Sequence, residues 1–281
     1  MPHDSRVKPH VGADIGEHGA AIPEPNGYIC VAGIDTLTGE IRTNGLWWAM
    51  KPISYARHRF PPDVIRHAIW LYLRFALSYR DVEDLLAERG LDVSNESIRR
   101  WVLKFGSAIA RNLRRMRPKP HDQWHLDEMV VSIGGQRMYM WRAVDSEGEV
   151  LDVLVQRRRD KAAALKLLRK LLKKQGFAPA VIVTDKLRSY GAALRTIGFS
   201  GEHEQGLRAN NRAENSHQPI RRRERKMGGF RSSKSAQRFV SFHAAVYNSF
   251  NVQRQLICRA TYRQFRAEAH NVWSDATVAV T

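Results

Sequence analysis

Three carboxylates occupy positions from which they could act together. Asp127 follows WHL in the strand-like segment QWHLDEMVVSI, and Asp185 ends the short apolar run VIVT. Glu214 lies in ANNRAENSHQPIRRRERK, a polar and basic stretch that should begin as a helix. Ligands collect at strand ends in open α/β sheets, and hard oxygen ligands from distant segments suit Mg²⁺ or Mn²⁺. The spacing therefore predicts a divalent-metal site.

Each carboxylate also has a purely structural interpretation. Asp127 could be an edge-strand acid, Asp185 could cap the next helix, and Glu214 could reciprocate Asn211 in a capping box. Glu128, next to Asp127, is a competing acid, but it should point to the opposite face of the strand. The other competing acids are Asp122 and Asp145.

The charge of the chain points to a polyanionic partner. The 281 residues hold 46 Lys and Arg against 28 Asp and Glu, for a net charge of +18. Residues 1–50 hold 3 basic and 6 acidic side chains, so the excess of positive charge lies entirely in residues 51–281. Nucleic acid is the first candidate for a basic body of this size, and a basic protein without such a partner is the alternative.

The periodicity between about residues 61 and 113 predicts three helices. PPDVIRHAIWLYLRFA opens with prolines, and SYRDVEDLLAERG begins with a capping-box pair, Ser78 and Asp81. SNESIRRWVLKFGSAIARNL has Ser94 as its expected N-cap and carries one apolar stripe. A short LDV turn joins the last two helices, which predicts a helix-turn-helix arrangement.

In that arrangement the third helix would enter the major groove by its N-terminal part. The residues off its apolar stripe that could contact DNA are Asn95, Glu96, Arg99, Arg100 and Lys104. A trihelical bundle that only packs on its neighbour is the alternative.

The pattern after residue 117 changes to α/β. Three strands are predicted at QWHLDEMVVSIGG, QRMYMWRAVDSEG and EVLDVLVQ. A helix with Leu165, Leu168 and Leu172 inward is predicted at DKAAALKLLRKLLKKQGF, and a buried strand at AVIVTD. SAQRFVSFHAAVYNSFNVQRQL is most simply a core helix that closes a mixed sheet. GYICVAGIDTLTGEIRTNG, near the N-terminus, could form a short hairpin with Thr38-Gly39 as its turn.

Several ordered blocks together resemble a known family. HLDEMVVSIGGQRMYMWRAVDSEGEVLDVLVQRRRDKAAALKLL, VIVTDKLRSYGAAL and NNRAENSHQPIRRRERKM resemble the DDE transposases of bacterial insertion sequences, in the insertion-sequence-six group. The resemblance covers roughly residues 55–270. It implies a ribonuclease-H-like mixed sheet flanked by helices and preceded by an all-α helix-turn-helix domain.

The resemblance also implies a site and a reaction. Asp127, Asp185 and Glu214 would hold two divalent ions, Mg²⁺ or Mn²⁺, and Arg221, seven residues after Glu214, would join them as a catalytic residue. Pro219 should kink the helix between the last two. The enzyme would nick element ends, free a 3′-hydroxyl and join it to target DNA in a replicative cointegrate. It would act as a homo-oligomer on double-stranded DNA.

Other basic residues are expected to contact phosphates. They are Arg157, Arg158, Arg159, Arg188, Arg222, Arg223, Arg225 and Lys226. Helix packing is the simpler interpretation of Tyr190, and His125 and His217 are given no catalytic role.

Two other functions remain open: a helix-turn-helix regulator with a decayed catalytic domain, and a metal-dependent nuclease that cuts without joining. The expected boundaries are an extension or appendage at 1–50, the helix-turn-helix domain at 51–116, the catalytic domain at 117–270 and a tail at 271–281. No apolar run is long enough to predict a membrane span, and Cys30 and Cys258 lie too far apart for a CxxC motif. A reducing bacterial cytoplasm, in association with the nucleoid, is the expected location.

Overall fold

The computed structural model describes residues 32–34, 41–43, 51–206, 210–252 and 257–279. The chain divides into two compact units, Met1–Asn44 and Gly45–Thr281. In the first unit, β1 (Ala32–Ile34) pairs antiparallel with β2 (Ile41–Thr43), which confirms the expected pairing. The expected Thr38-Gly39 turn and the rest of the N-terminal extension lie outside the described residues.

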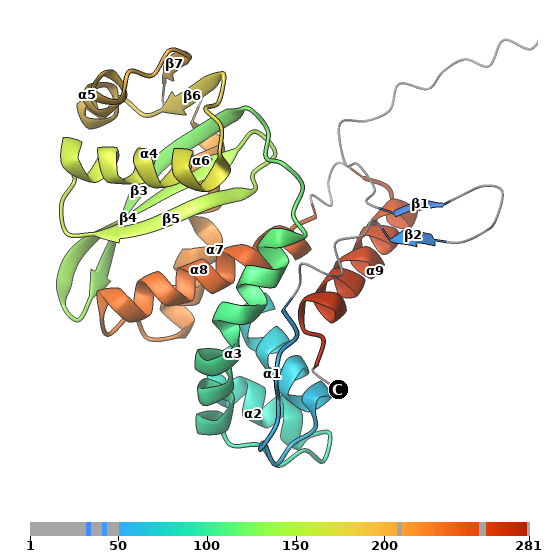
Figure 1. Cartoon of the computed structure of the whole chain (residues 1–281). Coiled ribbons are helices and arrows are strands. Elements are labelled where there is room, and N and C mark those ends of the chain that lie inside the picture. Colours follow the sequence, from blue (N-terminus) through green and yellow to red (C-terminus); the bar gives the residue numbers. More distant parts are fainter. Residues whose placement is uncertain (1–31, 35–40, 44–50, 207–209, 253–256, 280–281) are drawn as a thin grey trace, which may run out of the picture. The chain divides into compact units, whose positions relative to one another are not determined.

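Three helices open the second unit, as the periodicity predicts (Figure 1). They are α1 (Pro62–Arg74), α2 (Tyr79–Ala87) and α3 (Asn95–Arg115). The capping box of Ser78 and Asp81 starts α2, and the Ser94 hydroxyl accepts the Ser97 N–H at the start of α3. These caps satisfy N–H groups that a helix start leaves free, which is why both helices begin where the sequence predicts.

The described strands of the second unit form one five-stranded mixed sheet. In chain order they are β3 (Gln123–Ile133), β4 (Gln136–Asp145), β5 (Val150–Gln156), β6 (Val181–Thr184) and β7 (Glu202–Gln205). Their order across the sheet is β5-β4-β3-β6-β7. The first three pair antiparallel, whereas β6 runs parallel to both β3 and β7. With helices on both faces, this is the ribonuclease-H-like architecture expected.

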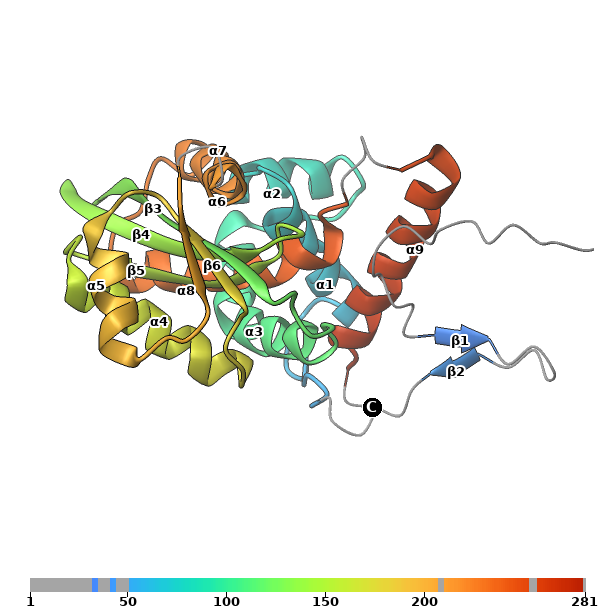
Figure 2. The ribbon, with the colours of Figure 1, turned by 90° about the horizontal axis from the view of Figure 1, so that it is seen from above.

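Alternation along β3 divides the apolar side chains between two cores. Trp124 and Leu126 pack with α4 (Lys161–Gln175) and α5 (Arg188–Ile197) on one face. Met129 and Val131 pack on the other, in a core that includes α8 (Ser233–Phe250). Figure 2 shows α4 and α5 on one side of the sheet and, on the other, α6 (Asn211–Ser216) and α7 (Gln218–Lys226).

The inward face of α4 differs from the expectation. Leu168 is buried as predicted, but Leu165 and Leu172 are only partly buried. The fully buried leucines beside Leu168 are Leu167 and Leu171. Ala163 and Ala164 are buried on the same side of α4. The buried face of the helix is therefore rotated slightly from the face that the sequence predicts.

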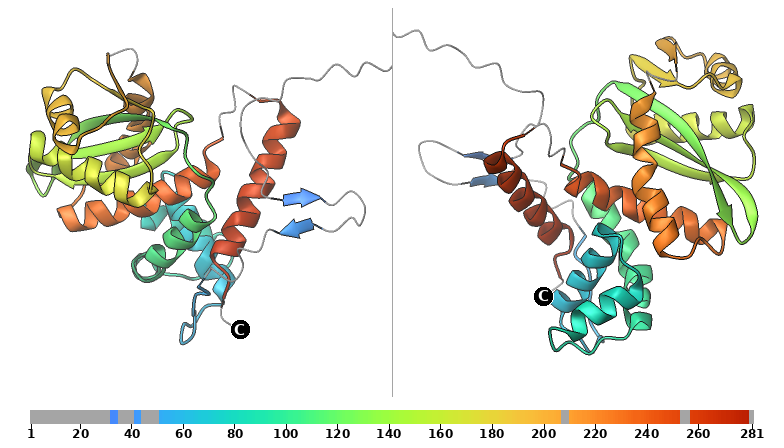
Figure 3. Two further views of the ribbon diagram at one scale, coloured as in Figure 1. Left: turned by 45° about the horizontal axis from the view of Figure 1, so that its top comes forward. Right: turned by 180° about the vertical axis from the view of Figure 1, so that it is seen from behind.

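The three N-terminal helices of the second unit share a core with the part that contains the sheet. Residues of α1, α2 and α3 belong to the same apolar cluster as those of α8, and Figure 3 shows α1 to α3 gathered beside it. Gly106 of α3 lies so close to α8 that a Cβ there would be 2.6 Å from the Phe242 ring. The two parts are thus packed together rather than joined only by a linker.

The C-terminal segment continues as a helix beyond the expected boundary at residue 270. α9 runs from Arg259 to Ala276, and Trp273 and Ala276 are buried against the helical part. Ile53 forms a β-bridge with Ala279. The tail expected at 271–281 is therefore, over its described residues 271–279, part of the fold. None of the helices in the described part is both long and apolar enough to cross a membrane.

Candidate active site

The acids singled out by the sequence line one cavity of about 710 Å³ where β3 and β6 lie side by side. Asp127 comes from β3, Asp185 follows β6, and Glu214 comes from α6. The whole lining consists of Asp127, Glu128, Met129, Val130, Arg159, Asp185, Asn210, Asn211, Glu214, Asn215, His217, Gln218 and Arg221. The fold therefore brings together segments separated by nearly ninety positions along the chain.

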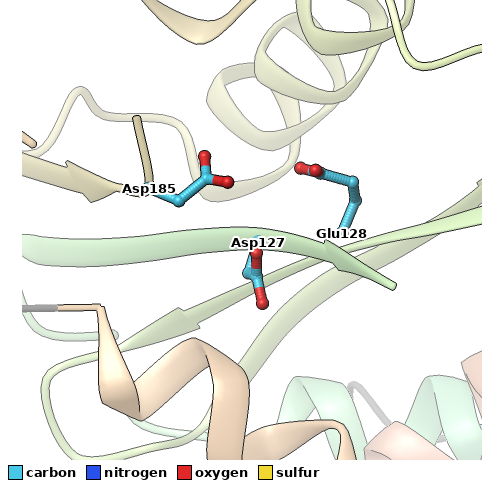
Figure 4. Close-up of side chains that lie close together, drawn as sticks. All are labelled: Asp127, Glu128 and Asp185. Carbon is cyan, nitrogen blue, oxygen red and sulfur yellow. The ribbon is translucent and has the colours of Figure 1, made fainter. Parts of the chain in front are cut away.

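In the described part of the chain, Asp127, Glu128 and Asp185 form a group of acids that could hold a metal ion. One carboxylate oxygen of each lies within 4.8 Å of the others. Glu128 and Asp185 turn their carboxylates toward each other on one side of β3, while Asp127 points to the other side (Figure 4). Oxygen ligands at this spacing suit a hard divalent cation, so the donor set fits Mg²⁺ or Mn²⁺.

Asp127 is supported by a histidine. His217 Nε2 lies 3.0 Å from Asp127 Oδ2, and the ring is 4% exposed. Burial lowers the pKa of His217 below its ordinary value, although Asp127 opposes that shift. A neutral ring that faces a carboxylate must donate from Nε2, so the bond fixes the tautomer of His217. The same bond fixes the orientation of the Asp127 carboxylate.

A buried arginine lies beneath this pair. Arg142 of β4 pairs directly with Asp127 in the sheet register and is fully buried. Among the described residues, its guanidinium has no hydrogen-bond partner, and desolvation lowers its pKa to about 10. The ring of Tyr247 lies 6.0 Å away. Arg142 thus places a positive charge on the side of β3 that carries Asp127 and His217.

Glu128 occupies the opposite face of β3, as its position in the strand predicts. Arg159 Nε lies 2.5 Å from Glu128 Oε1, and the Tyr190 hydroxyl donates to Oε2 at 2.9 Å. Desolvation raises the pKa of Glu128, although both partners act to lower it. Its carboxylate is held from two sides.

Asp185 both turns the chain and faces the cavity. Its Oδ1 accepts the Leu187 N–H at 3.0 Å, so part of its role is the structural one that its position before a helix suggests. Its Oδ2 lies 3.5 Å from Arg159 Nη2. The two roles use different oxygens and are compatible.

Glu214 is exposed on α6 and lines the cavity, but it is outside the 4.8 Å grouping. α6 ends at Ser216 and α7 starts at Gln218, so the chain breaks at the turn that Pro219 predicts. Arg221 lines the same cavity despite this break. The Asn210 side chain donates to the Leu126 carbonyl at 2.8 Å and fixes the start of α6 against β3.

The basic residues expected on DNA are mostly exposed. The exposed ones are Arg99, Arg100, Lys104, Arg157, Arg158, Arg159, Arg188, Arg221, Arg222, Arg225 and Lys226. Arg99 and Arg100 pair with Glu96 at 2.7 and 3.1 Å on the surface of α3. The amide of Asn95 donates to Glu83 at 2.6 Å and so joins α3 to α2.

Arg223 departs from the expectation. It is 2% exposed, and its Nη1 donates to the carbonyls of Phe75 and Leu77, each at 2.6 Å. Its guanidinium also lies over the rings of Tyr72 and Phe239. These contacts bind the Arg223 side chain to the carbonyl groups that follow α1. Arg223 is therefore a structural residue and not one of the exposed DNA contacts that the sequence predicts.

Sequence reasoning missed the supporting residues. Sequence patterns predict no catalytic role for His217. They predict packing for Tyr190, which its full burial confirms, but each of the two side chains also bonds to an acid of the cavity. The signal for His217 was its position three residues after Glu214, where a single helical turn brings it back to the same site. For Tyr190 and Asn210 the sequence alone offers no such signal.

Comparison with known proteins identifies the catalytic part. Residues 121–253 match a family model described as a DDE domain. The transposase for the insertion sequence-like element IS431mec of Staphylococcus aureus is 33% identical over 146 residues, which are 52% of this chain and 65% of that protein. The transposase for the insertion sequence element IS257 in transposon Tn4003, also from Staphylococcus aureus, matches to the same extent. The chain thus spans about two thirds of the length of the curated relatives it matches.

Among solved structures, the catalytic core domain of BIV integrase aligns with 13% identity and a TM-score of 0.33, over 53% of this chain and 97% of that one. The family match covers Asp127, Asp185 and Glu214, and the curated relatives named are insertion-sequence transposases. Residues 121–253 thus form a DDE domain, and the chain is similar over 146 residues to the transposases of bacterial insertion sequences.

Proposed function

We propose that this protein is a DNA transposase that nicks the ends of its insertion element and joins the freed 3′-hydroxyl to target DNA, with a replicative cointegrate as the product. The observation that carries the proposal is the single cavity that collects Asp127, Asp185 and Glu214 with Arg159 and Arg221. Acids that hold cations, next to arginines that bind phosphate, suit phosphoryl transfer. In the nicking step water breaks one phosphodiester bond and frees the 3′-hydroxyl. In the joining step that hydroxyl forms a new phosphodiester bond as a bond of the target breaks, so no external energy source is needed.

The residues of the cavity would have different roles in the reaction. Asp127, Asp185 and Glu214 would hold Mg²⁺ or Mn²⁺, which would activate the attacking oxygen and stabilise the leaving oxygen. His217 orients Asp127, and Asn210 holds α6, and with it Glu214, against β3. Arg221 lines the same cavity and would contact a phosphate there.

Double-stranded DNA is the proposed substrate and partner. Exposed pairs such as Arg99 with Glu96 contribute little to stability, so these arginines are available to phosphates. Joining two element ends requires that both be held at once, and we infer that the protein acts as a homo-oligomer on DNA, in the bacterial cytoplasm where that DNA lies.

A strand-transfer assay with labelled element ends tests the function. Wild-type protein with Mg²⁺ should give nicked and joined products, and Asp185→Asn should lower both by roughly a thousandfold while DNA binding persists. Asp122→Asn is the matched control, because Asp122 is an exposed acid outside the cavity. Cut ends without joined product would favour the nuclease, and binding without cutting would favour the regulator.

A further inference from the structure

Arg159 is placed differently from the two arginines that precede it. It lies between β5 and α4, directly before Asp160, whose carboxylate accepts the Ala163 N–H at 2.9 Å and starts α4. Its Nε lies 2.5 Å from Glu128 and its Nη2 3.5 Å from Asp185. The Arg159 side chain is 43% exposed and lines the cavity. The guanidinium therefore bridges the acids and still reaches solvent.

Glu128 is built to hold that guanidinium. Its side chain is 1% exposed, and its second oxygen accepts from Tyr190, which is itself fully buried. The Tyr190 ring packs edge-on against Trp141, with ring centroids 5.5 Å apart. A buried carboxylate with a bond on each oxygen has little freedom to move. Arg159 is thus held by a series of contacts that begins with Tyr190 in the core and passes through Glu128.

We propose that Glu128 and Tyr190 are positioning residues that hold Arg159 at the mouth of the cavity, and that Arg159 binds a phosphate of the DNA backbone beside the reacting one. This inference rests on the proposed function. A guanidinium carries five N–H donors in a planar fork. Glu128 and Asp185 engage one edge of it, and its exposed part presents the remaining donors to a phosphate oxygen.

The same geometry separates Glu128 from the acids proposed to bind metal. Glu128 belongs to the 4.8 Å grouping, so its position alone also suits a metal ligand. However, its two oxygens already bond to Arg159 and Tyr190, whereas Asp127 has one bond to His217. A positive charge at this point also reduces the repulsion between the acids and the incoming DNA.

Manganese binding without DNA tests the assignment of Glu128. By calorimetry, Glu128→Gln, Tyr190→Phe and Arg159→Ala should bind Mn²⁺ within about threefold of wild type, while Asp127→Asn and Asp185→Asn should lose about tenfold or more. A loss in Glu128→Gln as large as that in Asp185→Asn would overturn the proposal. Tyr190→Phe removes only one hydroxyl and serves if Glu128→Gln fails to fold.

Substrates with one backbone charge removed test the role of Arg159. A methylphosphonate is placed in turn at each phosphate near the cleaved bond. In wild type, one position should slow joining about 10- to 100-fold, and in Arg159→Ala that position should have no further effect. Arg159→Lys should rescue part of the loss, and Glu128→Gln should show the same loss in weaker form.

Lys161→Ala is the matched control, because it removes one exposed positive charge two residues away. It should keep the wild-type pattern of sensitivity to methylphosphonate. If Arg159→Ala keeps that pattern too, Arg159 does not contact a backbone phosphate and the proposal is wrong. If wild type joins no ends, the proposed function fails, whereas the manganese experiment still decides the role of Glu128.

Discussion

His217 donates from Nε2 to Asp127 Oδ2 across 3.0 Å, although the two residues are 90 positions apart in the chain. His217 stands at the break between α6 and α7, so the end of the helix that carries Glu214 also orients the acid on β3. This hydrogen bond therefore couples the position of Asp127 to that of the helix that carries Glu214.

Removal of this bond should impair the site without unfolding the protein. We expect His217→Phe to lower the rate of strand transfer and the Mn²⁺ affinity about 10- to 100-fold, as loss of residues that orient metal ligands typically does. His217→Gln can still donate to Asp127 and should retain more of both. Single-turnover kinetics and calorimetry measure the two effects, and wild-type values for His217→Phe would refute the role.

Arg223 should matter for stability rather than for DNA binding. Arg223→Met leaves the carbonyls of Phe75 and Leu77 without their donor inside the protein, and we expect a loss of about 3 kcal/mol in the free energy of unfolding. Arg222→Met, at the exposed neighbour, should change it by less than about 0.5 kcal/mol and should weaken DNA binding. Urea denaturation and salt-dependent DNA titration distinguish the two; the reverse pattern would restore Arg223 as a DNA contact.

The close approach of α3 and α8 predicts a second cost in stability. In Gly106→Ala the new methyl would meet the Phe242 ring at 2.6 Å, and overpacking of this kind costs about 1–3 kcal/mol. Alanine recovers about 1 kcal/mol through its helix propensity, so a net loss of about 1 kcal/mol is expected. Ser107→Ala, at an exposed position of α3, gives the propensity gain without the clash. Equal stabilisation by both substitutions would show that the helices can separate freely.

Much of this fold follows from local patterns in the sequence. The caps at Ser78 and Ser94 and the apolar stripe of α3 predict the helical part, because each reports on the residue's own helix. The alternation in β3 also predicts that Asp127 and Glu128 face opposite sides. Where a signal is local, the sequence is sufficient.

The remaining features depend on contacts that no local pattern encodes. β7 has the sequence EHEQ and is a strand only because it pairs with β6. α9 buries few apolar residues, chiefly Ala269, Trp273 and Ala276, so its stripe is weak. The hydrogen bonds from Tyr190 to Glu128 and from Arg159 to Glu128 connect three segments far apart in sequence. The burial of Arg223 depends on the carbonyl groups that follow α1.

His243 should make the stability of the protein depend on pH. This histidine of α8 is 5% exposed and lies between the rings of Phe239 and Tyr247, and desolvation lowers its pKa from 6.5 to about 3. Below about pH 6.5 the unfolded chain therefore binds a proton that the folded chain does not. The stabilisation is present above pH 6.5 and is lost as the pH falls toward 3, by at most about 1.4 kcal/mol per pH unit.

Replacement of the ring isolates this effect from other titrating groups. His243→Phe keeps an aromatic side chain between its two neighbours but cannot bind a proton, so its free energy of unfolding should fall less steeply between pH 6 and pH 4. The measurement is urea denaturation of both proteins at matched ionic strength across that range. His270→Phe is the matched control for the replacement of a histidine ring by phenylalanine, because His270 is an exposed residue of α9. Parallel curves for wild type and His243→Phe would mean that the folded protein admits a proton to His243, and that α8 opens to solvent in this range more readily than its burial indicates.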